Sequence, residues 1–590
     1  MALCAAAAGL LSTQSPGDAH AQETTIDSAS NRPISGLLGS ELSQNPSLAT
    51  SRALAPINGM GTAGWQEAPW SAPRWQTPVL NFSEGGFTGD IWLDSDPNTI
   101  VELVEEMPSA RESASAYQLA RRLLLSAAVP PQGVDDVTWQ GLRVERLAAL
   151  GDLSGLQRLL ALLPADQAGA LRDRVRAEIA LLTGDRDALC QMSDGRSPSP
   201  GQDSFWHRVA TVCQVERNDS AALRQHLEDL QLAGIDNGTA RLAWALLEGQ
   251  PLGDALLVGL EDVSLGAPEA QLLQRFSYTQ VRPLWHRVSA AGRMALAQDR
   301  RSDLRLRTLA SEWAVATQRL PAERLAAAYE DFPFAEADLR AGVAANLNLR
   351  GPVARAFAWQ SLALLQEPQE RLWLLESAME LAEKDRCYAG VAAVLLPRLD
   401  FSPENAAFAG TSGLAGRALY VMGRYEEATA WMLVARREST ISAQAANASW
   451  RLWPYARLAG LALPNDTTGL IAWRSTQSYE PEGLVSARET LLRELLRALG
   501  DGFNQGWVSA SSQQAILPSA ESGGGMALRS ASSRGQLGET LLRVVILVDG
   551  HRDGAASPGT LALAVEALDR IGLPLEARAL AIEAAHHAGI

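Results

Sequence analysis

Residues able to do nucleophilic or phosphate chemistry are few in this chain of 590 residues. Lys384 is the single lysine, and it stands between Glu383 and Asp385. A phosphate-binding loop needs a lysine that follows glycine and precedes Ser or Thr, so a Walker-type nucleotide site is excluded. No Gly-x-Ser-x-Gly elbow occurs, and Cys387 has no histidine near it in sequence. The sequence therefore predicts no nucleophilic catalyst.

The histidines do not form a metal-ligand pattern. Two imidazoles on one helix face need a spacing of about four residues, and none of the histidine pairs has it. The seven are His20, His207, His226, His286, His551, His586 and His587. We interpret the last two as helix-end residues favoured by the helix dipole. The sequence thus predicts no metal site and no cofactor.

Glu112 is the one acidic residue in a pattern known from catalysis. The stretch Glu112-Ser113-Ala114-Ser115-Ala116-Tyr117 resembles the Glu-Ser-x-x-aromatic stretch of the lytic transglycosylases, which cleave peptidoglycan. In that family one glutamate acts as an acid and then as a base. The Gly-Leu-Met-Gln segment that follows it in the family is absent here. We therefore interpret Glu112 as part of a capped helix start and predict no catalytic residue.

The cysteines leave two interpretations open. Cys4 lies in the amino-terminal segment, which leaves Cys190, Cys213 and Cys387, an odd number that argues against a disulfide framework. Cys190 and Cys213 fall in consecutive predicted helices, so an oxidising compartment could join them. The alternative is two buried thiols that pack as small apolar side chains.

The charge balance excludes nucleic acid as a partner. The chain has 67 acidic and 51 basic residues, a formal net charge of -16 at pH 7, which would repel a polyanion. Arginine-rich stretches such as 172–176 and 300–305 alternate with acids, and most of their side chains are expected on solvated helix faces. A minority could grip the carboxylates of a partner through planar guanidinium groups.

The first 64 residues are unlike the rest of the chain. Residues 1–21 combine a short apolar run with Ala19-His20-Ala21, the small-x-small pattern of a signal-peptidase site. This predicts export, with a periplasmic or secreted location. Residues 22–64 are rich in Ser, Asn, Pro and Gly and predict a flexible leader.

Residues 65–95 predict a Trp- and Pro-rich extended arm. Trp65, Trp70 and Trp75 recur every five residues, which is neither a helix period nor a strand period. Their indoles either pack onto the first helices or form an aromatic platform for a sugar or a partner segment. No later stretch has the roughly 18 to 20 apolar residues of a membrane-spanning helix.

Helical periodicity dominates from residue 96 onward. Amphipathic segments such as 304–318 and 367–385 place apolar residues at i, i+3, i+4 and i+7. The breaks between helices fall at 151, 184, 218, 249, 283, 318, 351, 385 and 423, a period of about 34 residues that is typical of helix-turn-helix solenoids. The sequence therefore predicts an all-α fold, a superhelical solenoid of antiparallel helix pairs.

The predicted solenoid covers residues 96–435, and further helices of it cover 436–500. A Gly/Ser-rich mobile loop is expected at 501–534, around Gly523-Gly524-Gly525. C-terminal helices are expected at 535–590. The sequence leaves the repeat register after residue 435 open.

One helix pair resembles a tetratricopeptide repeat residue by residue. In it, Gly416 should let two helices approach, Gly423 should close the turn, Tyr425 should wedge the joint and Ala428 should face the crossing point. Gly151 and Gly184 resemble the turn glycines of other copies, although residue 186 is Arg where the family has an aromatic. The resemblance implies a tetratricopeptide-like architecture over about residues 135–435. It also places Arg417 and Tyr420 on an inner helix, as candidates for partner binding.

Together these patterns predict a non-catalytic, protein-binding scaffold of the bacterial cell envelope. A partner segment would lie in the concave groove of the solenoid, held by aromatic and arginine anchors. The alternative is a peptidoglycan-binding or peptidoglycan-active envelope protein that uses the solenoid as a frame. Trp65, Trp70, Trp75 and Glu112 would distinguish this alternative. A homo-oligomer formed through the helices after Pro558 is a third hypothesis.

Overall fold

Helices form almost all regular structure in the part of the chain that the computed structural model describes. That part comprises residues 79–80, 84–126, 129–163, 169–194, 204–252, 256, 264–346, 348–399, 411–461, 468–501, 523–550 and 556–590. All of these residues belong to one unit, Ala53–Ile590. The predicted signal segment 1–21, the leader 22–64 and the residues Trp65, Trp70 and Trp75 lie outside the described residues.

The prediction of an all-α fold is confirmed for these residues. Their β-type pairings are two isolated bridges, Leu80 with Ser126 and Leu265 with Val288. The helices, in chain order, are α2 (Pro97–Glu106), α3 (Ala114–Leu125), α4 (Asp136–Ala149), α5 (Leu153–Leu162), α6 (Gly169–Thr183), α7 (Arg186–Asp194), α8 (Ser204–Glu216), α9 (Ser220–Leu232), α10 (Gly238–Leu247), α12 (Ala267–Leu273), α13 (Tyr278–Val281), η4 (Arg282–Arg287), α14 (Ala290–Gln298), α15 (Leu304–Ala316), α16 (Ala322–Glu330), α17 (Glu336–Ala341), α18 (Val343–Asn346), α19 (Gly351–Ser361), α20 (Pro368–Lys384), α21 (Tyr388–Leu395), η5 (Leu396–Arg398), α22 (Thr411–Val421), α23 (Tyr425–Glu438), α24 (Ala443–Leu458), α25 (Thr468–Ser475), α26 (Glu482–Ala498), α27 (Gly523–Ser533), α28 (Leu537–Asp549), α29 (Pro558–Arg570) and α30 (Pro574–His587).

Many helices begin at a side chain that accepts a backbone N–H. Ser113 accepts the N–H of Ala116 at the start of α3, and Asp152 accepts that of Gly155 at the start of α5. The first turn of a helix has N–H groups without an intrahelical partner, and a short polar side chain before the helix satisfies one of them. These starts are therefore specified locally, by residues next to each helix.

A recurrent turn ends many of the described helices. A residue in the left-handed backbone region follows the helix at positions 151, 184, 218, 234, 249, 318, 386, 423, 460, 500, 535, 572 and 589. The next N–H then bonds back into the last helical turn, as Asp152 N does to Leu147 O at 3.0 Å and Arg424 N to Leu419 O at 2.9 Å. This is the pattern of a Schellman cap. Most of these positions are glycine, which adopts a positive φ without a Cβ clash.

These turns fall at most of the predicted breaks. Most are 31 to 40 residues apart, or about twice that across 249 to 318 and 318 to 386. The turns at Gly234 and Gly589 do not keep this spacing, because each lies about half a period from a neighbouring turn. The predicted break at 283 differs, because η4 continues directly from α13 and residues 282–287 form a 3₁₀-helix there. The prediction at 351 also differs, because Gly351 begins α19 instead of ending a helix. Beyond residue 435, the turns at 460, 500, 535 and 572 continue the pattern that the sequence left open.

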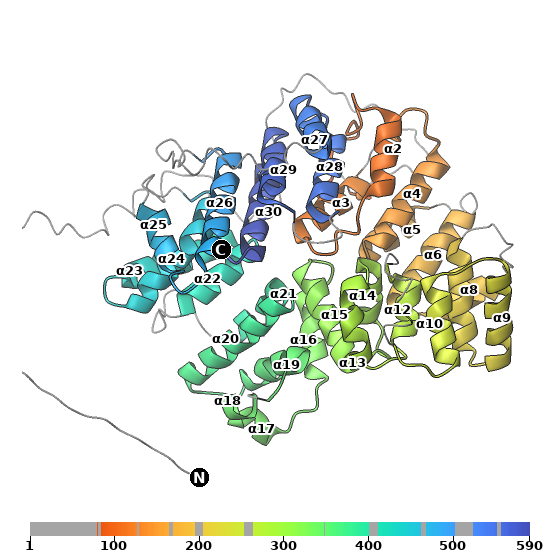
Figure 1. Ribbon diagram of the computed structural model, residues 1–590, viewed down its shortest axis with the longest axis horizontal. Helices are drawn as coiled ribbons and strands as arrows, with labels where there is room; N and C mark the ends of the chain where they lie inside the picture. The colour runs from red at the N-terminus through yellow and green to blue at the C-terminus, as the bar shows by residue number, and fades with distance from the viewer. Residues whose placement is uncertain are drawn as a thin grey trace, which may run out of the picture. The chain divides into compact units, whose positions relative to one another are not determined.

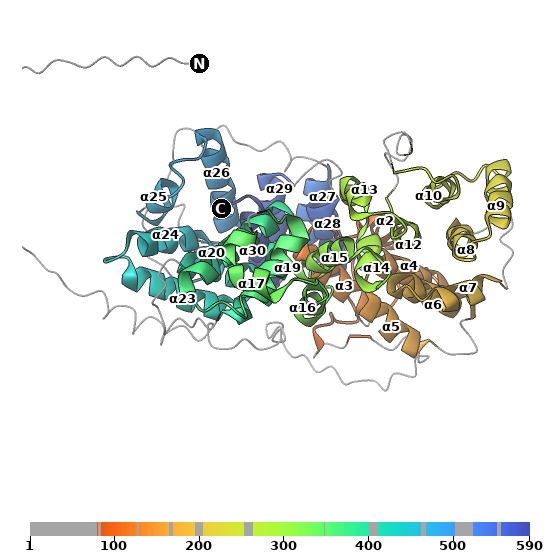
Figure 2. The ribbon, with the colours of Figure 1, turned by 90° about the horizontal axis from the view of Figure 1, so that it is seen from below.

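Helices contact their neighbours in sequence and also helices far along the chain. α14 contacts α4 and α6, and α15 contacts α21. Helices near the end of the described chain contact those near its start, since α28 packs against α2 and α3, and α30 packs against α3 (Figure 1). α30 also contacts α22 and α24. Figure 2 shows α27 and α28 beside α29 and α30. These contacts go beyond the nearest-neighbour stacking of a simple solenoid.

The described end of the predicted arm is not extended. Residues 89–95 form turns, and Phe87, Ile91 and Trp92 are buried. The Trp92 ring meets that of Trp139 edge to face at 5.4 Å, and Gly538 N donates to Ile91 O at 2.9 Å. The prediction of an extended backbone is therefore wrong for residues 89–95, which form turns, and the apolar side chains of this stretch are buried against α4 and α28.

The prediction of a mobile loop at 501–534 is wrong for its last part. Residues Gly523–Ser533 form α27, which packs against α28 and α29. Leu528 and Ala531 are fully buried, so tertiary packing outweighs the low helix propensity of the three leading glycines. Residues 502–522 lie outside the described part of the chain.

A buried ion pair joins α15 to α19. The Arg355 guanidinium donates to both Glu312 oxygens at 2.8 and 2.5 Å, and both side chains are fully buried. Tyr329 donates its hydroxyl to Glu312 at 2.7 Å, and Arg355 also reaches Asp385 at 2.8 Å. Free Cys387 is buried beside the same carboxylate. Such a group is tolerated in the core only because nearly every charge has a partner.

Replacing Gly390 by alanine should separate α15 from α21. A Cβ on Gly390 would lie 2.3 Å from Glu312 O and 2.7 Å from Ala316 N, both backbone atoms of α15. We expect Gly390→Ala to lower the free energy of unfolding by about 3 kcal/mol, measured by urea unfolding with circular dichroism. The matched control is Gly141→Ala in α4, where nothing lies within 4 Å, and it should raise stability by about 0.5–1 kcal/mol. Equal stabilities of the two variants would contradict the close approach of the helices.

Candidate functional site

The predicted binding residues Arg417 and Tyr420 lie on α22 but face different surroundings. Arg417 donates to both Glu383 oxygens at 3.2 and 3.0 Å and to the Tyr388 hydroxyl at 3.1 Å, with its side chain 28% exposed. Tyr420 is fully buried, and its hydroxyl lies 3.2 Å from that of Thr429. The expectation that Tyr420 lines an open binding surface is therefore wrong, because its ring is part of the core.

The predicted repeat residues around them lie on α22, on α23 and in the turn between these helices. Gly423 has a φ of 77° and ends α22, Ala428 is fully buried in α23, and burial raises the pKa of Tyr425 to about 12. Gly416 does mark a close helix approach. Its nearest neighbour is the Leu452 side chain, 2.6 Å from where a Cβ would stand, so the helix that approaches is α24.

Glu112 lies where several distant elements meet. Its Oε1 accepts from Arg111 Nε at 2.8 Å and lies 3.4 Å from Arg293 Nη2, on α14. Its Oε2 is 4.0 Å from Arg386, in the turn between α20 and α21. Arg111 also donates to the carbonyl of His286 in η4 at 2.5 Å. One half-exposed carboxylate thus receives three guanidinium groups from three parts of the chain.

The groups around Glu112 determine the pKa of its carboxyl group. Burial raises its pKa, but the positive charges of Arg293, Arg111 and Arg386 outweigh burial and hold the pKa below its ordinary value. Burial lowers the pKa of Arg293 to about 9, so this guanidinium is still charged at neutral pH. A general acid needs a raised carboxyl pKa. The environment of Glu112 is therefore opposite to that of a glycosidase acid.

The segment around Glu112 is held from the C-terminal end of the chain. Asp549, the last residue of α28, accepts the N–H of Arg111 at 2.9 Å and of Glu112 at 3.0 Å. Glu583 of α30 accepts the N–H and hydroxyl of Ser115, at 2.9 and 2.7 Å. Both carboxylates thus stabilise the N-terminal end of α3, where free N–H groups and the helix dipole favour negative charge.

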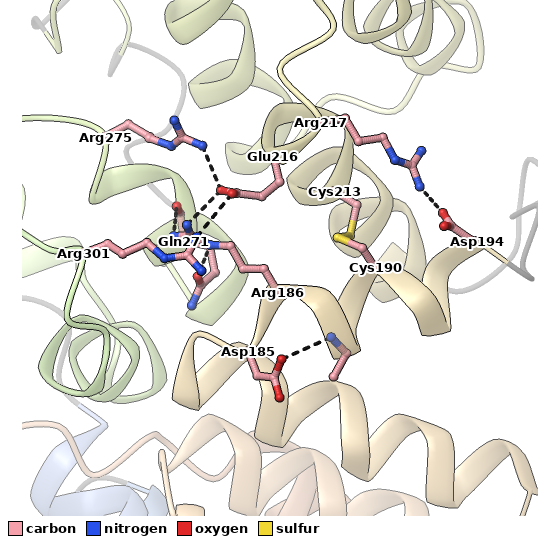
Figure 3. The surroundings of a disulfide bond; sticks show 11 residues. Asp185, Arg186, Cys190, Asp194, Cys213, Glu216, Arg217, Gln271, Arg275 and Arg301 are labelled. Carbon is pink, nitrogen blue, oxygen red and sulfur yellow. Dashed lines mark hydrogen bonds and ion pairs between the residues drawn. A yellow bond between two sulfur atoms is a disulfide. The ribbon is translucent and has the colours of Figure 1, made fainter.

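A second carboxylate with three arginines lies at the end of α8 (Figure 3). It belongs to Glu216, whose side chain is 15% exposed. Glu216 is 3.1 Å from Arg186 Nη1, 3.1 Å from Arg275 Nη2 and 3.6 Å from Arg301 Nη1. The Arg186 side chain is 5% exposed, whereas those of Arg275 and Arg301 are 42% and 58% exposed. We call these four residues the Glu216 cluster.

The buried side of the Glu216 cluster is built by polar contacts. Arg186 reaches Asp299 at 3.3 Å and Gln271 Oε1 at 3.1 Å. Gly184 makes room for Asp299, because a Cβ at that position would lie 2.6 Å from its carboxylate. Sequence had flagged only Arg301, within the arginine-rich stretch 300–305. Arg186, Arg275 and Glu216 were missed, because their meeting depends on α7, α8 and α12 packing together.

Cys190 and Cys213 form a disulfide that joins α7 to α8 beside this cluster (Figure 3). The sequence left open whether these cysteines are bonded or are two free thiols, and the structure contains the disulfide. Among all the described residues, no group of three His, Cys, Asp or Glu side chains is arranged to hold a metal ion. The same residues include no helix that is both long and apolar enough to cross a bilayer.

Comparisons of the chain with protein-family models, with curated proteins and with solved structures found no match.

Removing the Asp549 carboxylate should change how stability depends on pH. Burial raises the pKa of Asp549 from 3.8 to about 6, although the N–H groups of Glu112 and Arg111 oppose the rise. The pKa of Asp549 is higher in the folded state than in the unfolded state. Its contribution to the free energy of unfolding is therefore fully present below about pH 4 and is lost as the pH rises through 6. Relative to the parent chain, the free energy of unfolding of Asp549→Asn should rise by up to about 3 kcal/mol between pH 4 and pH 7. Urea unfolding at each pH measures this difference.

The control for this experiment is Asp194→Asn. Asp194 is 59% exposed and pairs with Arg217 on the surface, so its loss should change stability by less than about 1 kcal/mol at both pH values. A constant offset of Asp549→Asn, with no pH dependence, would contradict the assignment of a buried titrating carboxyl.

Proposed function

We propose that this chain is an exported bacterial protein that works as a non-catalytic binding scaffold in the cell envelope. Its described helices would be pairs of a degenerate, tetratricopeptide-like solenoid, antiparallel within each pair. Its partner would be a segment of another envelope protein. The recurrence of the left-handed turn from 151 to 572, mostly at 31 to 40 residues or twice that and with one additional turn at Gly234, is the observation that carries the proposal.

The recurrent turn supports a repeat architecture for a physical reason. Each turn sends the chain back after one helix, so consecutive helices pack as hairpins, as α22 does on α23 and α29 on α30. A hairpin of two short helices leaves apolar surface uncovered, and a further pair covers it. The close approach of Gly416 on α22 to Leu452 on α24 is consistent with such packing.

The disulfide supports the proposed location. A bond between Cys190 and Cys213 persists in oxidising compartments such as the periplasm and is rare in a reducing cytosol. It agrees with the signal-like pattern of residues 1–21. Thiol alkylation of intact cells should find these two cysteines protected and Cys387 reactive only after unfolding, because Cys387 is a buried free thiol.

Arginine contacts favour binding over catalysis. Glu112 and Glu216 are each held by three guanidinium groups, and several of these reach the surface. Exposed guanidinium groups offer planar, multidentate contacts to a partner's carboxylates. The peptidoglycan-related alternative rests on Trp65, Trp70 and Trp75, outside the described residues, and on Glu112, whose lowered pKa disfavours an acid role.

Site-directed crosslinking in cells tests the proposal. A photo-crosslinking residue at position 300, beside the Glu216 cluster, should give a discrete adduct with an envelope protein. The matched control is position 340 on α17, where Arg340 is 61% exposed and pairs with Glu336 within the same helix; it should give none. Specific binding to purified peptidoglycan without any protein adduct would overturn the scaffold proposal in favour of the alternative.

A further inference from the structure

The Glu216 cluster contains more positive than negative charge. Arg186, Arg275 and Arg301 contribute three positive charges, and their contacting carboxylates, Glu216 and Asp299, contribute two negative ones. One positive charge therefore remains, at a point where two of the three guanidinium groups are about half exposed. In a chain with a net charge of -16, this is a local attraction for one carboxylate within a repulsive surface.

The exposed arginines have donor capacity beyond their contacts with Glu216. A guanidinium group has five N–H donors. Glu216 takes a contact from one terminal nitrogen of Arg275 and one of Arg301. The two groups come from different segments, after α12 and before α15, and both point toward Glu216 (Figure 3). Both groups therefore converge on one carboxylate, and each keeps N–H donors beyond its contact with Glu216.

The disulfide fixes the frame of the cluster. Arg186 lies four residues before Cys190 on α7, and Glu216 lies three residues after Cys213 on α8. These are spacings of about one helical turn, so the covalent bond and the ion pair are adjacent connections between the same two helix faces. Holding α7 against α8 keeps Glu216 where Arg275 and Arg301 converge.

We propose that Arg275 and Arg301 bind a carboxylate of an acidic peptide segment in the partner protein, and that the Cys190–Cys213 bond keeps this site assembled. The inference rests on the proposed scaffold function and names the chemistry of its partner. Glu216 orders the two guanidinium groups before binding, which reduces the side-chain entropy lost on association. A long polyanion is disfavoured by the net charge of -16 of the whole chain.

Fluorescence anisotropy with a labelled hexaglutamate peptide and the oxidised full-length chain tests the site. Arg275→Gln and Arg301→Gln should each weaken binding about tenfold, because each removes a charge-assisted contact. The matched control is Arg217→Gln. Arg217 directly follows Glu216 and is 43% exposed, but its guanidinium pairs with Asp194 on the other side of the disulfide (Figure 3). This control should bind within twofold of the parent chain.

Reduction with dithiothreitol tests the role of the disulfide. The two thiols of dithiothreitol reduce the Cys190–Cys213 bond through a mixed disulfide, leave two protein thiols and become a cyclic disulfide. Reduction should weaken peptide binding several-fold, and Cys190→Ser with Cys213→Ser should do the same without added reductant. Circular dichroism of each variant checks that the helices remain formed.

Three outcomes would overturn the site. They are equal loss in the Arg217→Gln control, unchanged binding in Arg275→Gln and Arg301→Gln, or preference for inorganic phosphate or for a peptidoglycan stem peptide over hexaglutamate. The scaffold proposal fails separately. If the adduct at position 300 persists in the double arginine variant, the scaffold stands and this site is wrong; if no protein adduct forms even in the parent chain, the scaffold itself is wrong.

Discussion

The N-terminal end of α3 depends on carboxylates from the far end of the chain. Asp549 and Glu583 accept four hydrogen bonds from Arg111, Glu112 and Ser115, across more than 430 residues of sequence. Without them, N–H groups at the start of α3 would lack their acceptors. The contact also explains why α2 and α3 pack on α28 and α30. The start of α3 is thus bonded to α28 and α30, two described helices that lie far from it in the sequence.

Local chemistry explains which features could be predicted from the sequence. A cap such as Ser113 and a turn such as Gly423 act within a few residues, so their positions are encoded where they occur. The turns at 218, 318 and 386 use Asn, Gln and Arg instead of glycine, and tertiary packing must hold these side chains at positive φ. The α28–α3 contact and the Glu216 cluster have no local signal, because their partners come from distant helices.

The different surroundings of Arg417 and Tyr420 show why a repeat register does not identify a binding residue. Both lie on α22, three residues apart. Tyr420 stacks on Tyr455 of α24 and is fully buried, whereas Arg417 extends past Tyr388 to Glu383 and stays partly exposed. The register predicts which helix faces inward. Whether a residue on that face is core or surface depends on the next helix, here α24, which covers it.

Arginine connects the stability of this fold to its proposed binding. All but one of the 51 basic residues are arginine, and buried arginines join separate elements. Arg319 donates to the carbonyls of Leu150, Ser109 and Ala110, all within 3.1 Å, a set that the compact ammonium group of lysine could not reach in one plane. In the Glu216 cluster, Arg186 has this structural role, while Arg275 and Arg301 contact the same carboxylate and remain 42% and 58% exposed. A surface that binds carboxylates then needs no additional motif, because it is a helix junction with two of its arginines left partly exposed.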